Sequence, residues 1–164
     1  MGKRRKAREG ALQILYQLEF DNSSVDNAID SFWEKKKGPE ETQEYSRWLV
    51  QGILSRQSEI DEAIQSISEH WRIARMALVD RNILRLAAFE LLFAEGVAPA
   101  VIINEAIEIA KRFSGPEAAV FVNGILDALR KKIQAVKKPF EEVRHVRTKT
   151  REGKPKTSPR AKKD

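Results

Sequence analysis

The stretch DRNILRLAAFELLF, residues 80–93, is predicted to be a helix that is apolar on nearly every side. Asp80 stands where the N-cap or a first-turn acid of such a helix is expected. A helix without a broad polar face is normally surrounded by other elements. We therefore expect residues 80–93 to form the centre of the fold.

On both sides of this stretch, apolar residues recur at spacings of three, four or seven, which is the period of amphipathic helices. Only 7% of the residues are aromatic and glycine is sparse, so strands have little support. The pattern predicts an all-α protein of about six to seven helices. Besides the central helix, the predicted helices cover residues 3–20, 25–36, 41–69 with a break near Gly52 or Ser55, 101–113 and 117–136.

Short connections between the helices favour two small helical bundles packed together, residues 1–70 and 78–136, in a domain that spans residues 1–136. The apolar periodicity ends after Val136. Residues 137–164 are rich in Lys, Arg, Thr and Pro, and we expect them to form a basic, disordered tail.

Composition excludes several classes of protein. The 164 residues include no cysteine, which excludes disulfide scaffolds and thiolate metal sites. No apolar run reaches the length of a membrane span, and no secretory signal follows the basic N-terminus. We expect a cytoplasmic protein without a membrane partner.

The net charge of +6 is distributed unevenly. Residues 1–10 hold five Lys or Arg and one Glu, and residues 137–164 hold eleven Lys or Arg and four acids. The segment between them holds 14 basic and 19 acidic residues. Two basic ends on an acidic body indicate a polyanionic partner, although charged tails also serve solubility alone.

The sequence offers little support for an enzyme. His70 and His145 lack a second histidine at metal-binding spacing, and no Gly-rich phosphate loop or nucleophile elbow occurs. Glu105 and Glu108 would share one helix face, where surface or helix-junction carboxylates are the more common interpretation. We expect no catalytic residue, no metal and no cofactor.

The first helix carries the clearest signal for binding. Arg4, Arg5 and Arg8 lie at its start, and Tyr16 lies on the same side as Arg5. Guanidinium groups bind phosphate, and an exposed tyrosine stacks on an unpaired base, so this face suits single-stranded RNA. Alternatively, Tyr16 belongs to the core and the arginines only solvate the helix end.

Four segments resemble the transcription antitermination factor NusB family in order and spacing. They are RRKAREGALQILY at 4–16, DRNILRLAAFEL at 80–91, Pro99 with INEAIEIAKRF at 103–113, and FVNGILD at 121–127. The resemblance covers about residues 4–130 and does not include the tail.

The resemblance implies two helical subdomains that bind the boxA element of ribosomal RNA leader transcripts together with the ribosomal protein NusE, within the antitermination complex of RNA polymerase. It also implies two groups of site residues. The RNA-binding group is Arg4, Arg5, Arg8, Tyr16, Lys111, Arg112, Glu117 and Phe121, and the partner-binding group is Asp80, Arg81 and Tyr16. For the signature residues Asn104, Asn123 and Gly124 we expect structural roles, with Gly124 at a close helix–helix approach.

Two other functions stay open. The helical domain also resembles the N-terminal RNA-binding part of some ribosomal RNA cytosine methyltransferases, which would need a further catalytic domain. The other alternative is a protein-only adaptor whose basic ends are incidental. The sequence permits either a monomer or a homodimer.

Overall fold

The computed structural model describes the backbone of residues 2–157 and the side chains of residues 2–136. Every regular element in this part is helical, which confirms the all-α prediction. The elements are α1 (Lys3–Leu18), α2 (Val25–Lys36), α3 (Glu40–Ser55), α4 (Gln57–Ile67), the short 3₁₀ helix η1 (Ile73–Arg75), α5 (Leu78–Phe93), α6 (Pro99–Phe113) and α7 (Pro116–Thr157).

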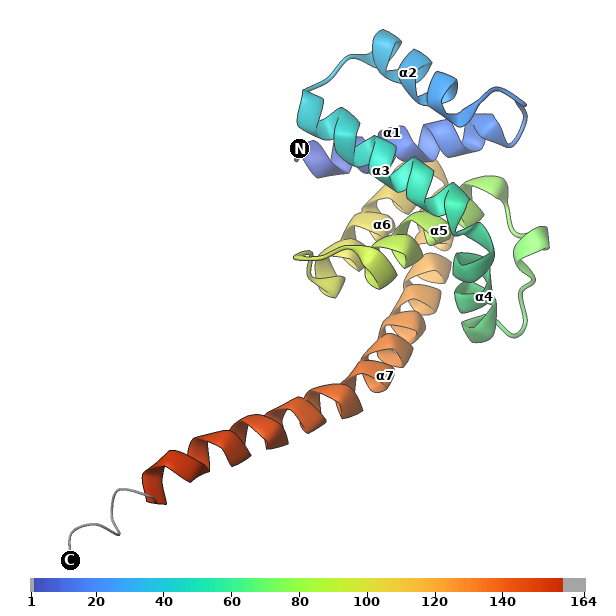
Figure 1. Cartoon of the computed structure of the whole chain (residues 1–164). Helices are drawn as coiled ribbons and strands as arrows, with labels where there is room; N and C mark the ends of the chain where they lie inside the picture. Colours follow the sequence, from blue (N-terminus) through green and yellow to red (C-terminus); the bar gives the residue numbers. More distant parts are fainter. Residues whose placement is uncertain (1, 158–164) are drawn as a thin grey trace, which may run out of the picture. The chain divides into compact units, whose positions relative to one another are not determined.

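Helix α5 is the central helix, as its sequence predicts. All ten residues from Asn82 to Leu91 are buried. Helices α1, α3, α4 and α6 pack against it, and in Figure 1 α1, α2 and α3 lie together above α5 and α6. Asp80 lies in the first turn of α5 rather than at the N-cap, which is Ala77. Since α1, α3 and α4 contact α5 directly, the two predicted subdomains share an extensive core.

Two glycines allow the helices around α5 to approach closely. A Cβ atom on Gly52 of α3 would lie 2.2 Å from Cζ of Phe89, and one on Gly10 of α1 would lie 2.5 Å from Cζ2 of Trp33. Both distances are too short for any side chain. Gly124 differs, because a Cβ atom there would meet no atom within 4 Å. The close helix approach expected at Gly124 is therefore wrong, and Asn104 and Asn123 are exposed as well.

The helix ends follow local chemistry. The hydroxyl of Ser24 accepts a hydrogen bond from the backbone N–H of Asn27 and caps α2. Pro99 occupies the first turn of α6, where its missing N–H costs nothing. The break predicted near Gly52 or Ser55 within residues 41–69 falls at Arg56, whose φ of −120° leaves the helical region between α3 and α4.

The chain divides into a compact unit, Met1–Arg130, and a second unit, Lys131–Asp164. The backbone of α7 is helical beyond the predicted end at residue 136. Lys, Arg and Glu are good helix formers, but a polar helix has no apolar period to reveal it. The prediction of a disordered tail over residues 137–164 stays a prediction, because the side chains of residues 137–157 and all of residues 158–164 lie outside the described residues.

Within the described residues, no helix combines the length and the apolar character needed to cross a bilayer.

Candidate nucleic-acid interface

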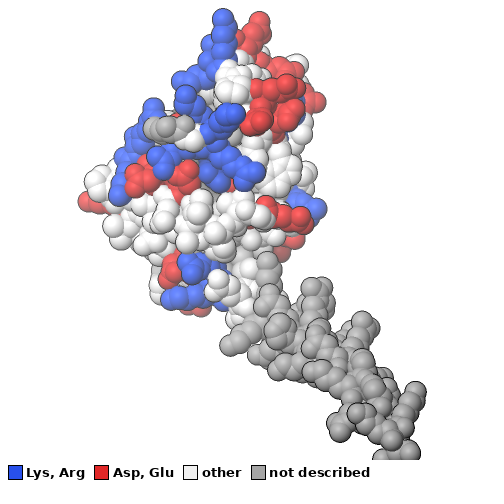
Figure 2. Space-filling view, turned by 90° about the vertical axis from the view of Figure 1, so that its left-hand side faces the viewer, with Lys and Arg blue, Asp and Glu red and all other residues white. Residues whose placement is uncertain are grey.

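The start of α1 presents a group of exposed cations, formed by Lys3, Arg4 and Lys6. Figure 2 shows Lys and Arg side chains gathered over the upper half of one face, with Asp and Glu beside them. The guanidinium carbon of Arg4 lies 4.5 Å from the centre of the Tyr45 ring, which orients this side chain on α3. The predicted position of Arg4 on an accessible basic surface agrees with this geometry.

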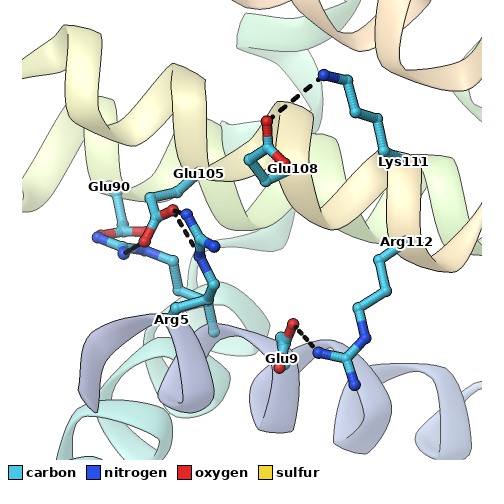
Figure 3. A network of polar contacts seen from close by, with 8 residues as sticks. Arg5, Glu9, Glu90, Glu105, Glu108, Lys111 and Arg112 are labelled. Atoms are coloured by element: carbon cyan, nitrogen blue, oxygen red, sulfur yellow. Dashed lines mark hydrogen bonds and ion pairs between the residues drawn. The ribbon is translucent and has the colours of Figure 1, made fainter. Parts of the chain in front are cut away.

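Arg5 lies on the same end of α1, but it is paired with an acid of α6. Its Nε atom donates a hydrogen bond of 2.8 Å to Oε2 of Glu105, and its Nη2 atom contacts the same oxygen. This hydrogen bond and the charge of Glu105 raise the pKa of Arg5, although partial burial opposes the shift. Figure 3 shows Arg5 reaching from α1 toward Glu105. An RNA phosphate would have to compete with Glu105 for this guanidinium.

Arg8 does not belong to the accessible surface. Its side chain is only 4% exposed, and its Nε and Nη2 atoms donate hydrogen bonds of 2.6 and 2.8 Å to the two carboxylate oxygens of Glu90, which is 1% exposed. Its Nη1 atom also donates to Oε1 of Glu105 at 3.3 Å. The expected RNA contact of Arg8 is therefore corrected: the residue joins α1 to α5 and α6 inside the protein. The sequence does not distinguish Arg8 from Arg4, because the two arginines lie one helical turn apart in the same basic run.

Tyr45 completes this buried network. Its hydroxyl donates a hydrogen bond of 2.6 Å to Oε2 of Glu90. Burial raises the pKa of Tyr45, and the hydrogen bond and the negative charge of Glu90 raise it further. For Arg8, burial lowers the pKa, but the hydrogen bonds and charge of Glu90 outweigh burial and raise it overall. The network thus keeps the arginine charged and the tyrosine neutral.

The second predicted RNA-facing segment lies at the end of α6 and the start of α7. Lys111 and Arg112 are exposed and pair with Glu108 at 3.5 Å and with Glu9 at 2.8 Å, respectively (Figure 3). Each of these cations therefore has an acidic neighbour in the folded protein.

Glu117 and Phe121 lie in the first turns of α7, beside a hollow of about 660 Å³. The hollow is also lined by Trp71, which is 61% exposed and makes an edge contact with Phe121, the ring centres being 5.8 Å apart. Trp71 was not predicted as a site residue. A large aromatic in a polar loop before a buried helix is the signal that would have found it.

Of the predicted partner-binding residues, Asp80 lies at the hollow and Arg81 in an ion pair within the chain. Asp80 lines the same hollow and accepts a hydrogen bond of 2.7 Å from the Ser114 hydroxyl. Arg81 donates two hydrogen bonds of 3.1 Å to the carboxylate of Glu19 and is largely buried. This pair ties α5 to the end of α1, so the guanidinium of Arg81 is already engaged within the chain.

Tyr16 is 41% exposed and makes an edge contact with the more exposed Phe20. It borders an apolar recess of about 370 Å³ whose other walls include Phe32, Val79 and Phe113. Tyr16 is therefore not a core residue. An exposed aromatic beside an apolar recess is typical of a protein-binding surface.

Helices that present cations at one end and apolar recesses elsewhere are typical of a helical protein that binds other macromolecules. Among residues 2–136, no group of three His, Asp or Glu side chains is placed to hold a metal ion.

The model of the NusB family matches residues 5–131. The transcription antitermination protein NusB of Koribacter versatilis is 44% identical over 138 residues, which cover 84% of this chain and 94% of that protein. The chain therefore belongs to the NusB family.

Solved structures agree with this membership. NusB of T. maritima superposes with a TM-score of 0.73 and 37% identity, covering 78% of this chain and 90% of that one. A structure of the antitermination factors NusB and NusE in complex with dsRNA contains a chain with a TM-score of 0.73 and 29% identity, covering 80% and 98% of the two chains.

Proposed function

We propose that this chain binds boxA-like, single-stranded RNA of ribosomal RNA leader transcripts together with NusE, and that the assembly supports processive transcription by RNA polymerase in the cytoplasm. The observation that carries the proposal is the exposed group Lys3, Arg4 and Lys6 at the start of α1. The related NusB structure that contains both NusE and RNA supports the choice of partners.

RNA contacts would begin at the start of α1. Lys3, Arg4 and Lys6 offer phosphate contacts, which fix the position of the RNA but carry no sequence information. Sequence would be read through unstacked bases, for which Trp71 and Phe121 offer an exposed aromatic surface at the start of α7. The buried Arg8 supports this surface by fixing α1 on α5 and α6.

NusE would bind on the side of the apolar recess. Tyr16, Phe20 and the recess supply an apolar centre, and Asp80 supplies a polar edge for a basic residue of the partner. Arg81 would lie at the edge of this contact beside Asp80. Its guanidinium would not bind NusE, since it is already paired with Glu19.

The proposal is tested by two matched arginine variants. Arg4→Gln removes an exposed arginine that lies 4.5 Å from the Tyr45 ring centre, and Arg56→Gln removes an exposed arginine that lies 4.5 Å from the Phe93 ring centre. A phosphate contact on single-stranded RNA contributes about 0.7 to the salt slope, which is worth about fourfold in affinity at 0.15 M salt. We expect this loss for Arg4→Gln and not for Arg56→Gln, measured as the dissociation constant at two salt concentrations.

Equal effects of the two variants would exclude the start of α1 as the RNA contact and favour a protein-only adaptor. Because the related complex contains dsRNA, a duplex of the same sequence is titrated beside the boxA-like single strand. If the duplex binds more tightly than the single strand, the proposed ligand is double-stranded RNA.

A further inference from the structure

A second basic feature lies beside the start of α1 and was not predicted. A hollow of about 380 Å³ is lined by four cationic side chains from three places in the chain and by one acid. Lys6 comes from α1, Lys36 and Lys37 from the end of α2, Arg112 from the end of α6, and the acid is Glu9. The hollow therefore carries a net charge of about +3 in a body whose sequence is acidic overall.

The scaffold of this hollow is closely packed. Trp33, which also lines it, is buried between two glycines, because a Cβ atom on Gly10 would lie 2.5 Å from Cζ2 and one on Gly38 would lie 3.2 Å from Cζ3. The ring thus holds α1 close to the turn after α2. This packing, rather than contacts among the lysines themselves, brings Lys6 near Lys36 and Lys37.

The backbone of Lys37 gives an independent indication of function. Its φ of 58° and ψ of 148° lie near a region that glycine adopts readily and residues with a Cβ rarely do. Lys37 is the one non-glycine residue with positive φ in the described part of the chain. Its N–H donates a 2.8 Å hydrogen bond to the Trp33 carbonyl, which closes the last turn of α2 at this residue. A lysine at a position suited to glycine indicates that its ammonium group is needed there.

We propose that this hollow, the α2-end hollow, binds a backbone phosphate of the RNA beyond the contacts made at the start of α1. Lysines are point charges that suit phosphate and need no particular base. Lys6 belongs to both surfaces, so one RNA strand can follow the cations from Lys3 and Arg4 into the α2-end hollow. Arg112 is held there by Glu9 at 2.8 Å and contributes its outward face. This inference rests on the proposed RNA binding and extends its path.

The chain contains a matched control for the α2-end hollow. Lys35 is exposed in the last turn of α2, next to Lys36, but it does not line the hollow. The variants Lys36→Gln, Lys37→Gln and Lys35→Gln each remove one positive charge. They are titrated with a boxA-like single-stranded RNA that carries flanking nucleotides and with a scrambled RNA of equal length, at two salt concentrations and with NusE present.

We expect Lys36→Gln and Lys37→Gln to weaken the binding of both RNAs by the same factor, about fourfold at 0.15 M salt. The salt slope of binding should fall by about 0.7. Lys35→Gln should change both quantities less. If all three variants behave alike, the effect is general electrostatics and the α2-end hollow is not a phosphate site.

A second variant separates the side chain from the backbone. Lys37→Gly relieves the unfavourable φ, so it should raise the melting temperature while it lowers RNA affinity as much as Lys37→Gln does. Unchanged RNA affinity in Lys37→Gly would overturn the inference, since the lysine would then be dispensable.

These outcomes differ from those that bear on the proposed function. If the unmodified chain prefers the boxA-like RNA but the lysine variants match Lys35→Gln, the inference fails and the proposed function stands. If the chain binds both RNAs equally and the lysines still matter, the phosphate site stands and boxA recognition fails. If the unmodified chain binds neither RNA, both fail.

Discussion

At the scale of single residues, the ion pair of Arg8 and Glu90 is the most consequential contact. Removing one partner of a buried pair leaves an uncompensated charge, which typically costs about 3–5 kcal/mol. We expect Arg8→Ala to lower the free energy of unfolding by about this amount, measured by urea denaturation.

The control for this prediction is Arg56→Ala, because the pair of Arg56 with Glu59 is exposed on both sides. Exposed pairs contribute about 1 kcal/mol or less. A loss as small for Arg8→Ala as for Arg56→Ala would show that the interior pair is not a structural link between α1 and α5.

Tyr45 predicts a pH dependence of stability. The pKa of Tyr45 is raised in the folded protein, whereas a tyrosine in the unfolded chain titrates at about pH 10. Below about pH 10 both states keep the proton, and above it the unfolded chain loses the proton first, so stability falls as the pH rises.

Tyr45→Phe removes this titration. We expect its free energy of unfolding to decline less steeply above about pH 10 than that of the unmodified chain, as measured by urea denaturation over a pH series. Parallel declines in the two proteins would show that Tyr45 keeps its ordinary pKa.

Residue roles were harder to predict than residue positions. Arg4, Arg5 and Arg8 form one basic run in the sequence, yet Arg4 is exposed, Arg5 is paired at the surface and Arg8 is buried. Their different roles depend on pairing with Glu90 and Glu105, which lie 82 and 97 positions from Arg8 in the chain. No local pattern reveals such a distant partner.

At the scale of elements, the glycines in helix interiors give opposite predictions. Gly52→Ala gains about 1 kcal/mol of helix propensity. However, its Cβ would lie 2.2 Å from Cζ of Phe89, and overpacking typically costs about 1–3 kcal/mol. At so short a distance the steric cost dominates, and we expect Gly52→Ala to be less stable in urea denaturation.

Gly124→Ala is the matched variant, because it changes the same residue type inside α7 and its Cβ meets no atom within 4 Å. There the propensity gain of about 1 kcal/mol is unopposed. Stabilisation by both substitutions would contradict the packing described for α3 and α5.

The helices themselves were largely predictable. The apolar period located α5 as the central helix, and Ser24 and Pro99 mark helix starts through their local chemistry. The α2-end hollow was not predictable, since it depends on the packing of Trp33 against Gly10 and Gly38. The run Lys35–Lys37 was visible in the sequence, but which lysines face the hollow is a property of the folded chain.

At the scale of the whole molecule, the positive charge of residues 1–136 is concentrated at the start of α1, where the proposed ligand binds. The segment 11–136 carries five more acids than bases, whereas residues 1–10 carry a net charge of +4. Acids beside the cations, such as Glu9 and Glu105, limit contact with arbitrary polyanions because a phosphate must displace them. Specific binding should therefore need both the correct RNA and the partner.

The most direct test is a titration of the full chain with a boxA-like single-stranded RNA and a scrambled RNA of equal length, with and without NusE, at two salt concentrations. We expect tighter binding of the boxA-like RNA, a larger preference when NusE is present, and weaker binding of both RNAs at the higher salt concentration. Equal affinity for the two RNAs with NusE present, or no binding of either, would contradict the proposed function.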